Sequence, residues 1–463
     1  MRNISLTVLI LALISFWNIA YTQNKSSFSL DEAIEFALMN NHNVKNAQTD
    51  VELARQKVRE TTAIGLPQVN GKITNTNYIN IPTTLMPDFL SPIIHKVNED
   101  DFGLTPINPL GDATFFPAQF GTKYNATAEL SVAQLIFNGS YLVGLQAARA
   151  YLDQSKVQLV KSNIDTKEQI SKAYFLVLTT EQNKIVLDST LKSLINMASE
   201  TAEIYKQGFI EELNVDQINL MVKDLEATLV YVNNQIVLAR YYLKLLMGFD
   251  INEPIYLSDQ IESLLSQYSE TSLLIAPFDF NHHIDYKILE NQKDLSRLSL
   301  KNEQSTYLPS ISGFFTAQTN AMRDKYNFLS GGERWYPTTV WGLQMDIPIF
   351  SSGSRGSKVQ QAKLNLQKVK EMGMQLQESL TIEEKNTKTN FKNALLILDN
   401  KHTSLKLAKK IYQNTSLKFS EGISSNMDLL QAYNQYLAAE SEHNNAILEL
   451  VNAKIALEKL FTE

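Results

Sequence analysis

Two long helical stretches dominate the hydrophobic pattern of the chain. The first runs from Ser140 to Gln207 without a proline, and its apolar residues return in alternating steps of three and four. The stripe consists of Ile170, Ala173, Val177, Leu187, Leu191, Leu194, Ala198 and Tyr205. This spacing is typical of a coiled-coil seam. A helix of this length spans roughly 100 Å, so we expect it to lie along partner helices rather than inside one compact core.

The same organisation recurs in the second half of the chain. A second long helical pattern runs from Ser354 to Glu421, and each long pattern stops at a glycine, Gly208 or Gly422, where the chain needs a left-handed turn to reverse. The matching segments are 66–71 with 308–313, 130–137 with 343–350, and the closing helices 213–247 with 425–460. The sequence therefore predicts a tandem duplication of helix, strand, loop, strand, long helix, turn and helix.

Four shorter segments alternate apolar and polar residues and are predicted to be strands. The alternation is clean in 124–132 and 339–347 and weaker in 69–78 and 311–320. Strands of about ten residues with one apolar face suit an outer-membrane β-barrel. A half-buried sheet in a soluble domain is the alternative. The strands lie between long helices and no other segment is available to cover the sheet, which favours the membrane.

This interpretation assigns a direction to each side chain of the two clean strands. The polar residues Glu129, Gln344 and Asp346 are expected to face the lumen or the barrel base. The residues expected to face lipid are Tyr124, Ala126, Leu130, Val132, Trp341, Leu343 and Met345.

Two segments break the periodicity. The segment 79–123 holds six of the twelve prolines and is predicted to be a long exposed loop, whereas its counterpart, 321–337, is much shorter. The segment 249–281, with Pro254 and Pro277, is predicted to form a small lateral collar on the helices.

The N-terminus and the composition restrict the cellular location. Residues 1–22 combine Arg2 with an apolar run and the small residues Ala20 and Thr22, which predicts a secretory signal peptide; an N-terminal membrane anchor is the alternative. There is no cysteine, so neither a disulfide framework nor a lipidated cysteine is possible. A net charge of −7 disfavours nucleic acid as a partner.

No catalytic, cofactor-binding or metal-binding motif is found in the sequence. The six histidines are scattered, and the adjacent pair His282 and His283 points to different sides of a helix. The pairs 211–212 and 383–384 are glutamates typical of a solvated surface rather than a catalytic dyad. We therefore expect no enzyme, no cofactor and no metal.

Several of these features together carry a resemblance to a known family. They are the opening 29–38 with Asn40 and Asn41, the two Leu-Pro strand starts, the 349–350 and Gly353 junction, the two glycine turns, and 243–248. The order of these motifs and their duplication make the chain resemble the TolC-type outer-membrane efflux protein family. The resemblance covers essentially all of the mature chain. It implies a homotrimer in which each chain gives four strands to a twelve-stranded β-barrel and its long helices to a periplasmic α-barrel.

The predicted function is a passive outer-membrane duct for efflux or type I secretion. The resemblance implies a periplasmic adaptor and an inner-membrane transporter of the RND, ABC or MFS type as partners, with outer-membrane lipid around the barrel. A periplasmic coiled-coil tether without channel activity is the alternative. The expected segments are 1–22 signal peptide, 23–65 N-terminal helices, 66–137 first β-hairpin, 138–248 first helical hairpin, 249–281 lateral segment, 282–307 helix, 308–350 second β-hairpin and 351–463 second helical hairpin.

The two glycine turns are the predicted functional ends of the helices. By resemblance they dock the adaptor, through Gly208, Phe209, Ile210, Gly422 and Ile423; the alternative is that the apolar residues only pack the turn.

The same turns are predicted to hold the periplasmic gate. Asp428 lies where the family pattern carries an aspartate of the tunnel constriction, and Gln431 replaces a second aspartate. Together with Asp216, three copies of Asp428 would form an acidic ring that prefers cations. Ser425 and Asp428 also match a helix capping box, so helix capping is the alternative role.

Overall fold

The computed structural model describes residues 27–87 and 115–462, and its described part is mainly helical with one four-stranded antiparallel sheet. The predicted fold class is thereby confirmed. The predicted signal peptide lies outside the described residues. The chain divides into two units, one of residues up to 56, 149–297 and from 364 onward, the other of residues 57–148 and 298–363. None of the helices in residues 27–87 and 115–462 has the length and hydrophobicity required to cross a membrane.

The two long helices end where the sequence predicts. Helix α5 spans Gly139–Lys206 and α10 spans Ser354–Ser420, and the helices that follow are α6 (Glu212–Met247) and α11 (Asn426–Phe461). Gly208 and Gly422 have φ angles of 82° and 74°, a conformation that costs a glycine little. Each hairpin therefore reverses at a glycine.

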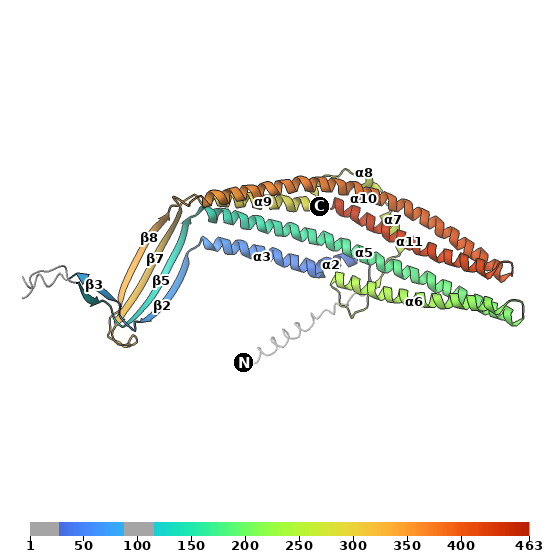
Figure 1. Cartoon of the computed structure of the whole chain (residues 1–463), viewed down its shortest axis with the longest axis horizontal. Coiled ribbons are helices and arrows are strands. Elements are labelled where there is room, and N and C mark those ends of the chain that lie inside the picture. Colours follow the sequence, from blue (N-terminus) through green and yellow to red (C-terminus); the bar gives the residue numbers. More distant parts are fainter. Residues whose placement is uncertain (1–26, 88–114, 463) are drawn as a thin grey trace, which may run out of the picture. The chain divides into compact units, whose positions relative to one another are not determined.

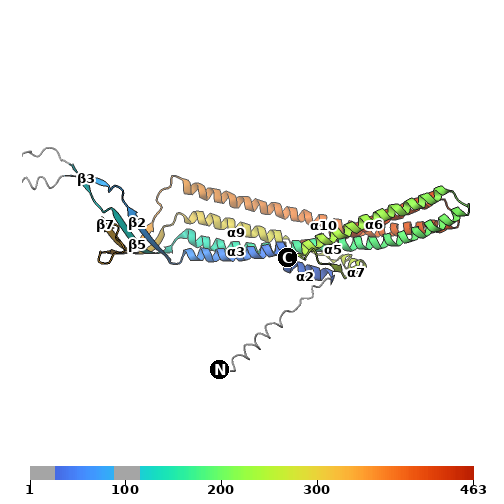
Figure 2. The ribbon, with the colours of Figure 1, turned by 90° about the horizontal axis from the view of Figure 1, so that it is seen from below.

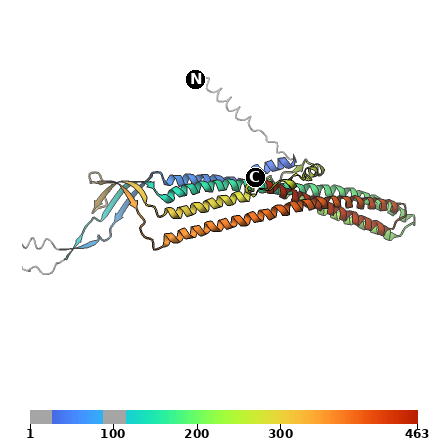
Figure 3. The same cartoon turned by 90° about the horizontal axis from the view of Figure 1, so that it is seen from above.

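The two helical hairpins share one hydrophobic core. A cluster near the turns joins residues of all four helices, among them Leu194, Leu225, Tyr412 and Leu429. Figures 2 and 3 show the α5–α6 and α10–α11 hairpins running alongside one another in this region. The seam predicted from the spacing of three and four is thus a packed interface between the two halves of the duplication.

The N-terminal helices pack on the same unit. Helix α2 (Leu30–Asn40) begins with a capping box between Ser29 and Glu32, and α3 (His42–Ile64) follows after a single residue. That residue, Asn41, is buried and donates its side-chain amide to the carbonyl oxygen of Leu246 at 2.6 Å. Gly248 lies against this turn, since a Cβ placed on it would stand 2.3 Å from the backbone oxygen of Asn40.

The predicted lateral collar contains short elements instead of bare loop. Strand β6 (Tyr256–Leu257) pairs in parallel with β1 (Ser27–Phe28), and α7 (Ile261–Tyr268) packs into the core beneath them. Three further elements precede strand β7: α8 (Ser272–Ile275), a 3-10 turn at Phe280–His282 and α9 (Ile284–Ser305). Tyr174 of α5 closes this core by donating its hydroxyl at 2.9 Å to the carbonyl oxygen of Phe28 or to Asp259 Oδ2.

The main sheet brings together the strands of both halves. Its order is β2 (Gln68–Asn77), β5 (Tyr124–Phe137), β7 (Ser310–Arg323) and β8 (Tyr336–Asp346), all antiparallel, as Figure 1 shows. The outer strands β2 and β8 are the two edges, so the sheet is open within the described part of the chain.

Part of the predicted long loop is itself a hairpin, which corrects that prediction. Strands β3 (Thr83–Pro87) and β4 (Phe115–Gln119) pair antiparallel. Pro87 and Pro117 occupy this two-stranded ribbon, where proline is tolerated because an edge strand needs few of its N–H groups. The rest of the predicted loop, residues 88–114, lies outside the described residues.

Candidate functional site at the helix turns and the sheet

The turns at Gly208 and Gly422 are built alike at the backbone. In each, the residue after the glycine donates its N–H five residues back, from Phe209 to the oxygen of Ile204 and from Ile423 to the oxygen of Lys418. This is the Schellman pattern that closes a helix on a left-handed residue. Phe209 is 78% exposed and Ile423 is 75% exposed, while Ile210 is half-buried. The two outermost apolar side chains therefore do not serve to pack the turns within one chain.

Asp428 lies inside a complete capping box at the start of α11. Its Oδ2 accepts hydrogen bonds from the Ser425 hydroxyl at 2.6 Å and from the Ser425 backbone N–H at 3.1 Å. Its own N–H donates to the Ser425 Oγ at 3.2 Å. The hydrogen bond from the Ser425 hydroxyl, and after it the bond from the Ser425 N–H, stabilise the charged carboxylate and hold the pKa of Asp428 below its ordinary value. The capping role that the sequence offered as an alternative is thus present in the structure.

The remaining predicted gate residues lie nearby without joining that network. Asp216 and Gln431 are exposed on the second turns of α6 and α11. A residue that the sequence gave no reason to choose connects these two turns: Asn426, 5% exposed, donates its amide to Gln217 Oε1 and to the carbonyl oxygen of Asn214. Its own Oδ1 is buried and accepts no hydrogen bond from the described residues. The starts of the two closing helices are therefore tied together.

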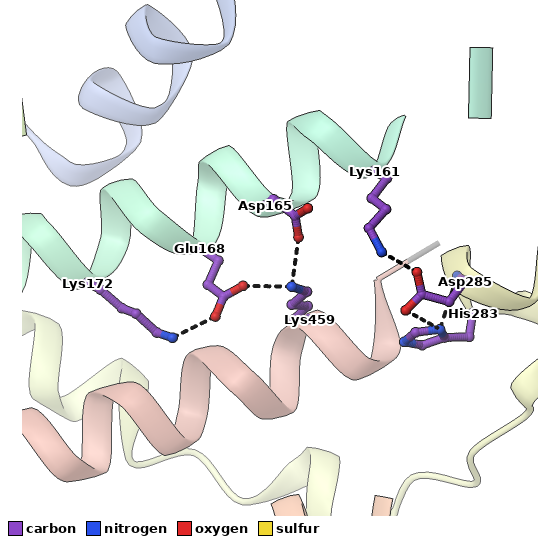
Figure 4. A network of polar contacts seen from close by, with 7 residues as sticks. All are labelled: Lys161, Asp165, Glu168, Lys172, His283, Asp285 and Lys459. Atoms are coloured by element: carbon purple, nitrogen blue, oxygen red, sulfur yellow. Dashed lines mark hydrogen bonds and ion pairs between the residues drawn. The ribbon is translucent and has the colours of Figure 1, made fainter. Parts of the chain in front are cut away.

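Ion pairs join the long helices farther along the same unit. Lys459 of α11 binds Asp165 and Glu168 of α5 at 2.7 and 2.8 Å, and Glu168 also binds Lys172 at 2.6 Å (Figure 4). Burial lowers the pKa of Lys459, but the hydrogen bonds to the two carboxylates outweigh it and raise the pKa overall. Burial raises the pKa of Glu168, but the hydrogen bonds and charges of Lys172 and Lys459 lower it by more, so the pKa lies below its ordinary value.

A second ion pair in Figure 4 fixes the start of α9. Lys161 of α5 pairs with Asp285, and the buried His283 accepts a hydrogen bond on Nδ1 from the backbone N–H of Asp285 at 3.2 Å. Burial lowers the pKa of His283, which keeps the ring neutral and able to accept. His283 is thus a helix cap rather than a metal ligand.

The strand register places the predicted lipid-facing residues on one face of the sheet. Val132 pairs with Phe315, which pairs with Trp341, so these three side chains project to the same side. The face is strongly apolar and open, with Trp341 76% exposed and Ile73 of β2 87% exposed. On the opposite side, Glu129 pairs with Lys72 and Gln318.

Ala126 and Tyr124 differ from the rest of that face. Ala126 is only 8% exposed, and the ring of Tyr124 stacks edge-on against Tyr326 of the β7–β8 loop at 5.6 Å. Tyr326 also accepts a hydrogen bond from Asn75 at 2.9 Å, so the loop covers this end of the face. The exposed apolar band therefore consists of the remaining predicted residues, Leu130, Val132, Trp341, Leu343 and Met345.

Comparisons with known proteins decide what kind of molecule carries these features. Residues 290–462 match the model of the family described as outer membrane efflux protein. This stretch, which holds most of the second half of the duplication, is therefore similar to the outer membrane efflux protein family. No curated protein matches the sequence closely enough to add to this assignment.

Solved structures extend the likeness across the chain. The outer membrane protein VceC of Vibrio cholerae matches with a TM-score of 0.67 at 15% identity, over 93% of this chain and 95% of its own. The CmeC outer membrane channel of Campylobacter jejuni matches with 0.68 at 18% identity, over 93% and 85%. CusC, described by conformational changes that accompany its folding and transmembrane channel formation, matches with a TM-score of 0.70 at 15% identity, over 94% of this chain and 92% of its own. At such identities these matches show a common fold.

The predicted identity and function are confirmed at the level of the family. The protein is an outer-membrane efflux channel with a helical extension in the periplasm, and it is a transport protein rather than an enzyme. The efflux family thus accounts for the duplication, the open sheet and the long hairpins together.

Proposed function

We propose that this efflux channel works as a homotrimer and as the passive exit duct of a tripartite efflux or type I secretion system. Three chains would contribute four strands each to one closed barrel in outer-membrane lipid. At the other end the helix turns would dock a periplasmic adaptor that belongs to an inner-membrane transporter.

The open sheet is the observation that carries this proposal. Among residues 27–87 and 115–462, strands β2 and β8 have no partner strand for their outer N–H and C=O groups. In hydrocarbon each unsatisfied group costs several kcal/mol, so a sheet with an exposed apolar face can enter a membrane only if its edges pair with other chains. A tether that stayed in the periplasm would expose this same apolar band to water instead.

The exposed apolar residues at the turns support docking there. Phe209 and Ile423 each follow the glycine of a turn and lie open to solvent on opposite halves of the duplication. Isolated apolar side chains on a polar surface are ordinary, but a pair presented by two rigid, equivalent turns offers a repeated anchor for a helical partner.

The gate remains part of the proposal. In the capping box Oδ2 of Asp428 accepts the hydrogen bonds, and the lowered pKa keeps the carboxylate charged. A trimer would bring three such charges together at the turns, where they would favour cations. Asp216 and the neutral Gln431 would line the same entrance.

Labelling of single cysteines in outer membranes tests the assembly. We expect a lipid-soluble maleimide to modify Leu130→Cys but not Glu129→Cys, because the register places these neighbours on opposite faces. Light scattering of the purified protein should give the mass of three chains. A soluble periplasmic monomer, or the reverse labelling pattern, would contradict the duct and favour the tether.

A further inference from the structure

Two histidines that are distant in the sequence meet between the helices of the second hairpin. His402 of α10 and His443 of α11 have ring centroids 5.5 Å apart, with an interplanar angle of 49°. They are in register with the buried contacts of Tyr412 with Tyr433 and of Phe391 with Lys454 in the same seam. The histidine pair therefore forms one layer of the α10–α11 interface.

This layer lies at a polar level of the α10–α11 seam. On α10 the residues Phe391, Leu398, Leu405 and Tyr412 repeat every seven positions and pack towards α11. Between Leu398 and Leu405 the chain places two polar residues on α10. Lys401, partly buried, binds Glu442 of α11 at 2.6 Å, and the neighbouring His402 is exposed. An apolar pair would be the ordinary choice at this level, because polar groups in a helical seam reduce stability.

The spacing of the two rings fits a shared metal ion. With metal–nitrogen bonds of about 2.0–2.1 Å and a tetrahedral angle, two coordinating imidazoles have centroids roughly 5 Å apart. The observed separation is close to this and requires only a small rotation of side chains. His402 is exposed and His443 is half-buried, so an ion can reach the pair from solvent.

Polar contacts of neighbouring residues flank the histidine pair. The Lys401–Glu442 ion pair joins α10 to α11 beside the rings, and Asn444 of α11 donates a hydrogen bond to Asn183 of α5 at 3.2 Å. The two helices that carry the rings are thus joined by an ion pair at the same level.

We propose that His402 and His443 form a two-histidine site for a divalent transition metal ion, with Cu²⁺ bound most tightly. Imidazole ligands suit Cu²⁺, Ni²⁺ and Zn²⁺, and for a given site affinity rises along this series to copper. The described residues contain no group of three or more His, Cys, Asp or Glu side chains suited to a metal, so the proposed site has these two protein ligands. Binding clamps α10 to α11 part-way along the hairpin.

Copper titration of the intact protein in detergent tests this site. We expect one Cu²⁺ per chain by calorimetry, with two nitrogen ligands in the electron paramagnetic resonance spectrum. His402→Gln and His443→Gln should each weaken binding by more than about tenfold, the lower end of what even an outer-shell change costs. His42→Gln removes an exposed histidine on α3 and should leave binding unchanged.

The outcomes separate a metal site from a merely structural polar layer. Helical content and oligomer mass, measured on each variant, show whether the protein is intact. His402 is exposed, so its variant is expected to fold even if the His443 variant does not. Unchanged copper affinity in folded His402→Gln, a single nitrogen ligand in the wild type, or equal loss in His42→Gln would each overturn the proposal.

Discussion

The two hairpin turns share a backbone and differ in how their second helix starts. At the first turn the cap residue Glu211 makes no side-chain cap to α6. At the second, Ser425 and Asp428 form a complete capping box at the start of α11. Because both turns close with the same glycine pattern, the glycine is sufficient for reversal and the capping box is an addition confined to one half. The duplication thus preserved the turn while its capping chemistry diverged.

The largest effect in this comparison is expected at a third glycine, where space is also restricted. Gly248 ends α6 at φ 68°, with the Asn40 backbone in the path of a Cβ. Gly248→Ala should therefore destabilise the protein by about 3 kcal/mol, combining the left-handed conformation with a steric clash. The matched changes Gly208→Ala and Gly422→Ala have nothing within 4 Å of the new Cβ and should cost only about 1–2 kcal/mol each. Thermal unfolding should rank the three; equal midpoints would show that the Asn40 contact is unimportant.

A larger residue at the turns should separate function from assembly. We expect Gly208→Val or Gly422→Val to abolish export while the oligomer persists, because a β-branched residue is strained at φ 82° or 74° and displaces the exposed apolar residue beside it. Efflux in cells and oligomer mass in detergent measure the two effects. Loss of the oligomer itself would argue against a role specific to the turns.

The caps can be exchanged between the two halves. Ser425→Ala removes the hydroxyl that accepts from the Asp428 N–H and should cost about 1 kcal/mol of stability. Glu211→Ser places a capping hydroxyl before α6 and should gain a few tenths to about 1 kcal/mol. Chemical denaturation of both variants checks this; equal and opposite changes would mean that the two turns differ only in this cap.

The smallest effect is a dependence on pH. Since hydrogen bonds hold the pKa of Asp428 below 3.8, its ionised form stabilises the folded state above that pH, and the stabilisation is lost as pH falls through the lowered pKa. Asp428→Asn should therefore be less stable than the wild type at neutral pH, with the difference closing in acid. In the Ser425→Ala background this difference should shrink, and a gap that persisted there would assign the effect to another partner.

The long helices could be predicted from the sequence because their signals are local. Alternating steps of three and four mark the seam, and Gly208 and Gly422 mark the ends, so the observed and predicted bounds differ by at most one residue. The strands were harder. Strand β5 continues to Phe137, beyond the clean alternation, because pairing with β7 extends it across an irregular step between Leu135 and Phe137.

Features that depend on long-range contacts were missed for a physical reason. The β3–β4 hairpin was hidden by prolines, which ordinarily argue against strands. The cover over one end of the strand face depends on Tyr326 meeting Tyr124 and Asn75, and the link between the closing helices depends on Asn426 meeting Gln217; neither pairing leaves a local pattern. His402 and His443 likewise read as scattered residues until the hairpin aligns them.

The most direct test of the account is single-channel recording of the purified protein in planar lipid bilayers. The wild type should conduct with a preference for cations, and Asp428→Asn should reduce both that preference and block by divalent cations, since it removes one charge from each chain at the proposed entrance. Unchanged conductance, selectivity and block in the variant would assign Asp428 to helix capping alone. A wild-type protein that inserts and forms no conducting pore would contradict the duct itself.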